Sequence, residues 1–270
     1  MRILVTGSAG HLGEALVRTI RNSGNEAVGT DLVASQFTNL VGSIVERDFA
    51  TQCIDGIDAV IHSATLHKPH VASHSRQAFI DTNITGTLNL LEAAAEDLCQ
   101  LFHRNHGLPC LVLRTSRFFP EQDDSPAIRE SFAGDNAKAN EFLFRRVDLE
   151  DAVSAHLCAV ERAPEIGFGR YIISATTPLE PQDLADLRTD AAAVIRRRVP
   201  QYEAVYRRLG WRMFAAIDRV YVNQKARDEL GWQPVYDFSR ITDQLDGGES
   251  MGSELARQVG SKGYHAEPFE

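Results

Sequence analysis

Residues 2–13 read RILVTGSAGHLG, and they predict a strand, a glycine-rich turn and the start of a helix. Its first part, Arg2–Thr6, is a short apolar and β-branched run that stops at a glycine, as a strand buried on both faces does. Glycines follow at positions 7, 10 and 13, and residues 14–20 then carry apolar side chains at helical spacing. Strand, glycine turn and helix therefore stand in the order that a phosphate-binding turn requires.

Each glycine has a physical task in such a turn. The first allows a tight bend, the second lets the backbone approach a pyrophosphate, and the third lets helix and strand pack closely. The phosphates then rest on the amide groups that open the helix, where the macrodipole favours negative charge. Three glycines alone are a weak signal, and the surrounding strand and helix make it specific. We expect a dinucleotide to contact Gly7, Gly10, His11, Leu12 and Gly13.

An acidic residue stands where a dinucleotide-binding domain needs one. Residues 26–30 predict a second buried strand, and Asp31 follows it, eighteen residues after Gly13. A carboxylate there accepts hydrogen bonds from the adenosine ribose and repels the extra 2′-phosphate of NADP, so the sequence favours NAD as the cofactor. The alternative is an aspartate that only caps a turn.

The remaining chain alternates strands with helices and then changes texture. Further strands are predicted at 43–46, 58–62, 109–114 and 171–174, and helices over 75–95 and 147–160. This alternation predicts an α/β fold with a Rossmann-type doubly wound parallel sheet. From Pro178 the sequence is charged and helical. We therefore expect a Rossmann domain at 1–177 and a smaller, mostly helical substrate lobe at 178–270, with contributions from 116–146.

Composition limits the ligand and the compartment. The chain carries 37 acidic and 28 basic side chains, a net charge of −9 that repels nucleic acid, so we expect a small-molecule substrate. No apolar run approaches the ~20 residues of a membrane-spanning helix, and the start does not read as a signal peptide. The four cysteines lie far apart without a CxxC pair, which is typical of a reduced, cytoplasmic protein.

Several motifs in the same order resemble the extended short-chain dehydrogenase/reductase family, the NAD-dependent epimerase/dehydratase group that acts mostly on nucleotide sugars. They are Thr6–Gly13, Asp48–Phe49, Asp58–Ala64, Asn83–Ala93, Val147–Ala152 and Lys225–Pro234. The resemblance spans nearly the whole chain. It implies that Asp48 and Phe49 flank the adenine, that the turn from His62 to Ala64 lies along the cofactor, and that Asn83 braces the fourth helix. Phe49 as plain core and Asn83 as a helix-interior amide are the structural alternatives.

The family's catalytic segment is not found where the resemblance places it. Members carry a serine on the fifth strand and a Tyr-x-x-x-Lys pair on the next helix, where the lysine lowers the tyrosine pKa for proton exchange. Here the end of the fourth helix runs directly into what resembles the second half of the fifth, and residues 1–114 contain no tyrosine. The one literal match, Tyr221–Lys225, falls in the C-terminal block, where we expect the lysine to begin a helix of the substrate lobe.

Three histidines follow the fourth strand, at the sheet edge where open α/β folds bind ligands. His67, His70 and His74 have a spacing that a metal could use, but Pro69 interrupts them and no acidic or thiol partner is near, so we expect no metal. Contact with substrate or nicotinamide and simple surface exposure remain open. Any residual acid–base chemistry is expected at these histidines and Thr65.

Loss of a strand has mechanical consequences. The 109–114 strand should lie beside the 58–62 strand, and the helix from about Ser75 to His106 is longer than one crossover needs. That helix should break near Ala95–Asp97, project, or pass to a partner chain, and an exposed apolar face on it favours a homodimer.

The sequence leaves three functions open. The first is an NAD-dependent oxidoreductase, epimerase or dehydratase acting on a sugar or nucleotide sugar with impaired or non-standard catalysis. The second is an inactive NAD-binding sensor or regulatory module, and the third is a deletion variant of an active parent. By position, Phe118, Phe119 and Pro120 are expected to wall the nicotinamide side, and Arg145 or Arg146 to meet a substrate phosphate.

Overall fold

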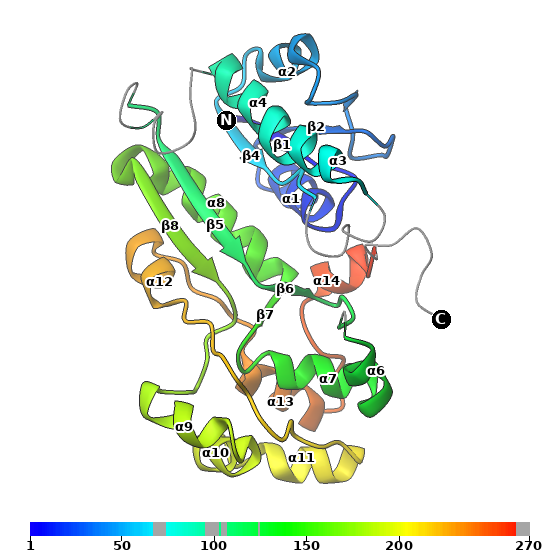
Figure 1. Ribbon diagram of the computed structural model, residues 1–270, viewed down its shortest axis with the longest axis vertical. Helices are drawn as coiled ribbons and strands as arrows, with labels where there is room; N and C mark the ends of the chain where they lie inside the picture. The colour runs from blue at the N-terminus through cyan, green and yellow to red at the C-terminus, as the bar shows by residue number, and fades with distance from the viewer. Residues whose placement is uncertain (67–73, 95–102, 104–106, 124, 263–270) are drawn as a thin grey trace. The chain divides into compact units, whose positions relative to one another are not determined.

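A computed structural model describes residues 1–66, 74–94, 103, 107–123 and 125–262 (Figure 1). The strands are β1 (Arg2–Thr6), β2 (Glu26–Asp31), β3 (Leu40–Val41), β4 (Ala59–His62), β5 (Cys110–Thr115), β6 (Arg117–Phe119), β7 (Arg146–Asp148) and β8 (Phe168–Ile173). The α-helices are α1 (His11–Asn22), α2 (Arg47–Ile54), α3 (Arg76–Ile80), α4 (Thr87–Ala94), α6 (Pro126–Ser131), α7 (Gly134–Glu141), α8 (Leu149–Ile166), α9 (Leu184–Leu187), α10 (Ala191–Arg198), α11 (Tyr202–Leu209), α12 (Gln224–Leu230), α13 (Phe238–Asp246) and α14 (Glu254–Val259). A π-helical turn, η2 (Asp81–Gly86), joins α3 to α4, and a 3-10 turn, η3 (Pro181–Asp183), precedes α9.

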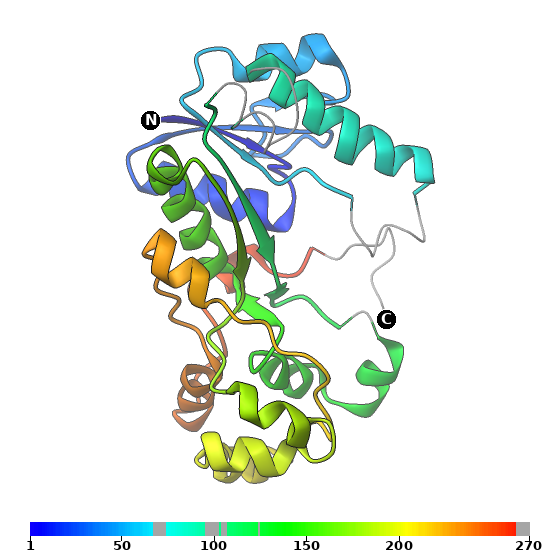
Figure 2. The same ribbon diagram turned by 60° about the vertical axis from the view of Figure 1, so that its left-hand side comes forward.

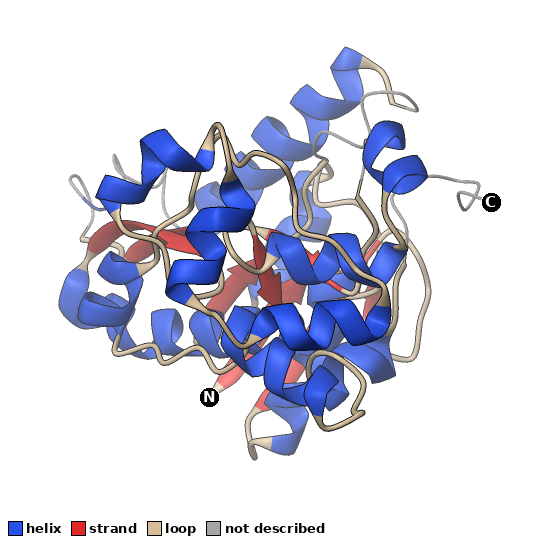
Figure 3. Cartoon of the chain, turned by 90° about the horizontal axis from the view of Figure 1, so that it is seen from below, coloured by secondary structure: helices blue, strands red, loops and turns tan. Residues whose placement is uncertain are grey.

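The chain forms two compact units. The first contains Met1–Val112, His156–Arg170 and the chain from Ser261 onward, and the second contains Leu113–Ala155 and Tyr171–Gly260. The expected division at residue 177 stays a prediction. Strands and helices both occur as far as β8, and the described residues after it form helices without a further strand; Figure 3 shows strands in red and helices in blue. None of the helices within the described ranges is long and apolar enough to cross a membrane.

The first unit contains a parallel four-stranded sheet in the order β3-β2-β1-β4. Thr6 at the end of β1 pairs with Thr30 on one side and His62 on the other, so the strands end together at one edge. Helix α1 covers one face of this sheet, and α2 and α4 cover the other, as Figures 1 and 2 both show. The doubly wound α/β arrangement predicted from the sequence is confirmed.

Alternation along the strands separates the two faces of the sheet. One face contributes Leu4 and Val28 to a buried cluster with side chains of α2 and α4. The other members of this cluster are Ile44, Ala50, Cys53 and Leu90. Ile3 and Val5 alternate with Leu4 and are also buried. The apolar run at the start of the sequence is therefore buried on both faces, as a central strand requires.

The third strand lies earlier than predicted. The structure places β3 at Leu40–Val41, where it pairs with Thr30 and Asp31 of β2, whereas the predicted strand at 43–46 forms a turn. The hydroxyl oxygen of Ser43 accepts the amide of Val45 at 3.2 Å, and the carbonyl of Ser43 accepts the amide of Glu46 at 3.0 Å. Serine side chains stabilise such turns in competition with strands, and this overrides the β-branched pattern.

The segment predicted as a helix from 147 begins as a strand. Residues 146–148 form β7, which pairs in parallel with β6, and α8 runs from Leu149 to Ile166. Asp148 separates the two because its carboxylate accepts the Glu150 amide at 2.8 Å. Such a side-chain acceptor satisfies a donor at the helix start and fixes where the helix begins.

The predicted neighbour of the 109–114 strand is wrong. Within the described residues, β5 pairs with β8 and β4 is an edge of its own sheet. Cys110 donates its amide to the Gly167 carbonyl at 2.7 Å, and Ser116 donates to the Ile173 carbonyl at 2.8 Å, so bonds flank the pair at both ends. Strands β5 and β8 each have six residues, whereas β4 has four. Pairing with β8 therefore gives more backbone groups of β5 a hydrogen-bond partner.

The helix predicted over 75–95 is present as α3, η2 and α4. The hydroxyl of Ser75 accepts the Ala78 amide at 3.1 Å and caps the start. The break expected at Ala95–Asp97, and the projection or partner contact beyond it, lie outside the described residues.

Two of the motifs recognised in the sequence meet in the second unit. Trp232 is 1% exposed, and its indole N–H donates to the Asp151 carbonyl at 3.1 Å and to the Ser154 hydroxyl at 3.0 Å. The Asp151 carboxylate in turn accepts the amides of Val235 and Tyr236, each at 2.8 Å. The Val147–Ala152 and Lys225–Pro234 blocks therefore form one hydrogen-bonded structure that joins α8 to the chain after α12.

Candidate functional site

The glycine turn between β1 and α1 leaves no space for side chains. Gly7 has φ +71°, and a Cβ there would lie 3.0 Å from the Ala64 amide nitrogen. A Cβ on Gly13 would lie 1.9 Å from the Gly7 carbonyl oxygen, and one on Gly10 would lie 3.1 Å from the same oxygen. Gly10 donates its amide to that oxygen at 3.0 Å. The turn is therefore closed on itself, with the start of α1 held directly against the end of β1.

Helix α1 opens on this turn without a side-chain cap. Its first residue is His11, which is buried, and Gly10 occupies the cap position with no side chain to accept the first amides. Glu14 makes the first intrahelical bond, to the Gly10 carbonyl at 2.9 Å. The first turn of an uncapped helix of 12 residues presents backbone donors and a positive dipole end to an anion.

Asp31 lies against the same turn. One of its carboxylate oxygens accepts the Ala9 amide at 3.0 Å, and the other accepts the Val33 amide at 3.0 Å. An ionised carboxylate offers about four acceptor positions, so two of them remain for hydroxyl groups of a ligand. The residue that the spacing predicted for ribose recognition is thus brought to the glycines by the fold.

At the end of β4, His62 is held between two threonines. Its Nδ1 lies 2.7 Å from the Thr6 hydroxyl and its Nε2 lies 2.9 Å from the Thr87 hydroxyl. Thr87 donates its own proton to the Asn83 carbonyl at 2.9 Å, so it accepts from His62, and the imidazole carries its proton on Nε2. The Thr6 hydroxyl then donates to Nδ1 and accepts the amides of Ser63 and Ala64, each at 3.1 Å.

Asn83 fixes the segment that follows β4. Its side-chain amide donates to the Leu66 carbonyl at 2.6 Å, and its oxygen accepts the Leu66 amide at 2.7 Å. Asn83 lies in the π-helical turn η2, a distortion that often marks functional sites. Thr6, His62, Thr87 and Asn83 therefore set the backbone from Ser63 to Leu66 beside Gly7. Neither threonine was predicted as a site residue from the sequence, although Thr87 follows Asn83 by one helical turn.

Burial lowers the pKa of the His62 imidazole to about 4, from an ordinary value of 6.5. Between pH 6.5 and about 4, His62 is therefore protonated in the unfolded chain but not in the folded chain. The free energy of unfolding falls as the pH drops through this window, by up to about 3 kcal/mol. We expect His62→Gln to be less stable than the unchanged chain at pH 7 and to lose less stability on acidification. Urea unfolding at pH 7 and pH 4.5, followed by circular dichroism, measures this difference. Parallel pH curves for the two proteins would contradict it.

The remaining predicted residues are exposed, pack in the buried cluster, or are not described. Asp48 is exposed in the first turn of α2, and Phe49 packs on the buried cluster and against Gly42. Thr65 and His74 are exposed, and His67 and His70 fall outside the described residues. No group of three potential metal ligands occurs in the part of the chain that the structure describes. The adenine contacts of Asp48 and Phe49 stay predictions.

The literal Tyr-x-x-x-Lys match lies in the second unit. Lys225 is the second residue of α12, so the prediction that it begins a helix is confirmed. Its ammonium lies 4.8 Å from the centre of the Tyr171 ring and 3.8 Å from the Glu229 carboxylate. Tyr171 donates its hydroxyl proton to Glu229 at 2.7 Å, and burial with this carboxylate raises the tyrosine pKa to about 12.

Arg146 is committed to the interior of the second unit. It is fully buried, its guanidinium forms an ion pair with Glu141, and it donates to the carbonyls of Phe118 and Glu121 at 2.7 and 2.8 Å. Arg145 is one third exposed and pairs with Asp123 at 2.5 Å. Of the two arginines considered for a substrate phosphate, only Arg145 has solvent access.

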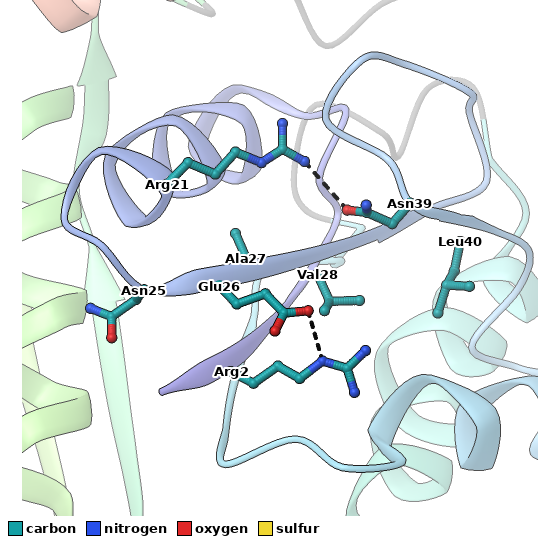
Figure 4. A pocket seen from close by; sticks show the side chains of 8 residues that line it. All are labelled: Arg2, Arg21, Asn25, Glu26, Ala27, Val28, Asn39 and Leu40. Carbon is teal, nitrogen blue, oxygen red and sulfur yellow. Dashed lines mark hydrogen bonds and ion pairs between the residues drawn. The ribbon is translucent and has the colours of Figure 1, made fainter.

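A hollow of about 450 Å³ opens elsewhere in the first unit (Figure 4). It is lined by residues at the amino ends of β1 and β2, where Arg2 and Glu26 pair at 2.9 Å, and Arg21 donates to Asn39 at 3.4 Å. Ligands of open α/β sheets bind at the carboxyl ends of the strands. The hollow lies at the opposite edge from Gly7 and Asp31 and is not the dinucleotide site.

A family model and several curated proteins match part of this chain. A sequence model of the NAD dependent epimerase/dehydratase family matches residues 3–142. The 3β-hydroxysteroid dehydrogenase/Δ5→4-isomerase of Mycobacterium tuberculosis is 33% identical over 111 residues, covering 37% of this chain and 30% of that protein. The dTDP-glucose 4,6-dehydratase of Shigella flexneri is 38% identical over 111 residues, covering 35% of this chain and 31% of that protein. The matches thus span about a third of the length of these curated relatives.

A solved structure matches over nearly the whole chain. A short-chain dehydrogenase/reductase superfamily protein from Agrobacterium tumefaciens, solved with bound NAD, superposes with a TM-score of 0.62 at 18% identity, covering 96% of this chain and 97% of that one. At this identity the likeness shows the fold, and it agrees with the Rossmann-type prediction.

Proposed function

The chain belongs to the NAD-dependent epimerase/dehydratase family, and on this premise we propose that it binds NAD at the glycine turn of the first unit. The observation that carries the proposal is the carboxylate of Asp31, which accepts the Ala9 amide beside three glycines whose positions admit no Cβ without displacement. The residues fit the cofactor because the first turn of α1 offers backbone donors that would bind its pyrophosphate, and the Asp31 carboxylate offers acceptors for a ribose. His11 and Leu12 open the helix that would hold the pyrophosphate.

The cofactor supplies hydride transfer, and the chain's own residues bind and orient it. Gly7, Gly10 and Gly13 would admit the pyrophosphate to the N-terminus of α1, and Asp31 would accept hydrogen bonds from the ribose hydroxyls. The segment from His62 to Ala64, held by Thr6, would lie along the dinucleotide, with Asn83 behind it. Asp48 and Phe49 are proposed for the adenine side.

We propose an oxidoreductase of the epimerase/dehydratase type that acts on a sugar or nucleotide sugar. The dTDP-glucose dehydratase relative supports this substrate class, and the hydroxysteroid dehydrogenase relative supports a hydroxysteroid as the second candidate. Because the Tyr-Lys pair is not found in its expected place, we propose that catalysis is impaired or non-standard. An NAD-binding sensor or regulatory module, or a deletion variant of an active parent, is the alternative.

An absorbance assay separates these functions. The chain with NAD is offered a panel of nucleotide sugars and 3β-hydroxysteroids. Net oxidation is followed by the absorbance of reduced nicotinamide, and the sugar products are followed by chromatography, because an epimerase or dehydratase returns the hydride and leaves NAD unchanged overall. Loss of a positioned acid–base group lowers the rate by about 10²- to 10⁴-fold, so slow turnover supports the impaired enzyme. Binding without turnover favours the sensor, and rapid turnover would show that another group has replaced the tyrosine.

Cofactor choice gives a prediction for Asp31. The carboxylate should repel the 2′-phosphate of NADP, so we expect NAD to bind at least about tenfold more tightly than NADP. In Asp31→Asn this preference should shrink to about threefold or less, mainly because NADP binds better. Calorimetric titration of both dinucleotides measures it. The control is Asp218→Asn, which removes the same charge from an exposed position in the second unit. An unchanged preference in Asp31→Asn would refute the ribose assignment.

Two further expectations concern location and assembly. We propose a cytoplasmic protein, supported by the net charge of −9 and by Cys53, Cys110 and Cys158, which form no disulfide in the described residues.

We also propose a homodimer, because Ile80 and Ile84 on α3 and η2 are 37% and 49% exposed and lie one turn apart. Sedimentation of the full chain tests the assembly.

A further inference from the structure

The end of the described chain returns to the glycine turn. After α14 and Gly260 the chain belongs to the first unit again, and there the ammonium of Lys262 donates to the Ala9 carbonyl at 3.1 Å. The same ammonium forms an ion pair with the Glu14 carboxylate. The two residues are 248 positions apart in the sequence. Ala9 also gives its amide to Asp31, so one peptide segment of the turn is held by Asp31 through its amide and by Lys262 through its carbonyl.

Glu14 makes this contact relevant to anion binding. Its side chain is 8% exposed and lies in the first turn of α1, at the helix end where we place the pyrophosphate. A carboxylate is favourable at a helix N-terminus by itself but repels a second anion bound there. Arg18 pairs with Glu14 at 2.7 Å from the next turn of the helix. Glu14 and Arg18 together carry no net charge, and with Lys262 the three side chains carry one positive charge.

We propose that Lys262 is a positioning residue of the dinucleotide site: it holds the Ala9 peptide of the glycine turn and offsets the Glu14 carboxylate, so that the N-terminus of α1 accepts a pyrophosphate. This inference rests on the proposed NAD site. The dinucleotide and the contacts of Lys262 with Ala9 and Glu14 would favour the same arrangement of the turn. Each should therefore strengthen the other.

The test compares NAD affinities by calorimetry in three variants. Lys262→Met should weaken NAD binding by about three- to tenfold, since one positive charge near a pyrophosphate is removed across a partly screened distance. Lys262→Arg should bind within about twofold of the unchanged chain, because it keeps the charge and donors for Ala9 and Glu14. Lys225→Met is the matched control, because Lys225 pairs with Glu229 in the second unit, and it should leave affinity unchanged.

A double variant separates the charge effect from general loss of structure. In the double variant with Glu14→Gln and Lys262→Met, only Arg18 of the three side chains keeps its charge. The sum is then one positive charge, as in the unchanged chain. We expect this protein to regain at least half of the lost affinity on a logarithmic scale. If Lys262 only tethered the chain, the double variant would bind NAD no more tightly than Lys262→Met.

The outcomes distinguish this inference from the proposed function. If the unchanged chain does not bind NAD, the proposed site itself is wrong. If it binds NAD and Lys262→Met binds equally well, the site stands and the role of Lys262 is refuted. Tighter binding by Lys262→Met would also overturn it, since the contact would then obstruct the site.

Discussion

Replacing Gly13 by alanine should weaken NAD binding by about a hundredfold or more. The new Cβ would lie 1.9 Å from the Gly7 carbonyl oxygen, 2.6 Å from its carbonyl carbon and 2.8 Å from the Ser8 Cα, all of which are backbone atoms. No side-chain rotation relieves such a contact, so the start of α1 must move away from the end of β1. A displacement of about 1 Å in a positioned site costs about 10²-fold, and we expect the dissociation constant of NAD to rise by at least that factor.

A matched glycine separates this local effect from a general effect of added volume. Gly134 is in α7 of the second unit, and a Cβ built there meets no atom within 4 Å. Gly134→Ala should therefore bind NAD as the unchanged chain does. Circular dichroism and thermal unfolding establish that the Gly13→Ala chain is folded before it is titrated. A folded Gly13→Ala protein with unchanged affinity would rule out the glycine turn as the pyrophosphate site.

Replacing Trp232 by alanine should destabilise the protein by about 3 to 5 kcal/mol. The side chain is among the largest fully buried ones in the described chain, and its removal opens a cavity beside α8. It also leaves the Asp151 carbonyl and the Ser154 hydroxyl without the indole donor. Urea unfolding followed by circular dichroism measures the loss.

Trp232→Phe divides this effect into its two parts. Phenylalanine retains much of the buried apolar volume but has no N–H to donate, so we expect it to cost about 1 to 3 kcal/mol. The difference between the two variants is then the contribution of packing. Trp211, which is only partly buried, provides the comparison at the surface, and Trp211→Ala should cost less than Trp232→Ala. Equal losses at the two positions would contradict the assignment of Trp232 as the link between the two motifs.

The glycine turn was predictable because its physics is local. Strand, turn and helix are contiguous, and the sharp bend at Gly7 and the close approach at Gly13 are requirements on single residues. Asp31 was predictable for a related reason, because parallel strands end at one edge and bring its carboxylate to the turn. The order of apolar runs likewise predicted β1, β2 and β4.

The errors arose where distant residues or short polar contacts decide the structure. The partner of β5 is β8, which lies more than 50 residues further along the chain, and no pattern within β5 identifies this partner. Ser43 converts a β-branched stretch into a turn through one side-chain bond. The contact of Lys262 with Ala9 and Glu14 had no local signal, because a single lysine near the chain end looks like any surface charge.

The polar support behind the site shows the same limit. The motif that contains His62 is visible in the sequence, but its tautomer depends on Thr6 in β1 and on Thr87 in α4. Only the assembled sheet and helix bring these hydroxyls to the two ring nitrogens. Sequence patterns therefore identify which residues contribute to the site, and the fold determines how each is held.

The most direct measurement is calorimetric titration of the unchanged chain with NAD and then with NADP. We expect saturable binding of one NAD per chain and at least about tenfold weaker binding of NADP, because the pyrophosphate would rest on the first turn of α1 and the ribose on Asp31. Absence of saturable binding by either dinucleotide, or equal affinity for both, would contradict it.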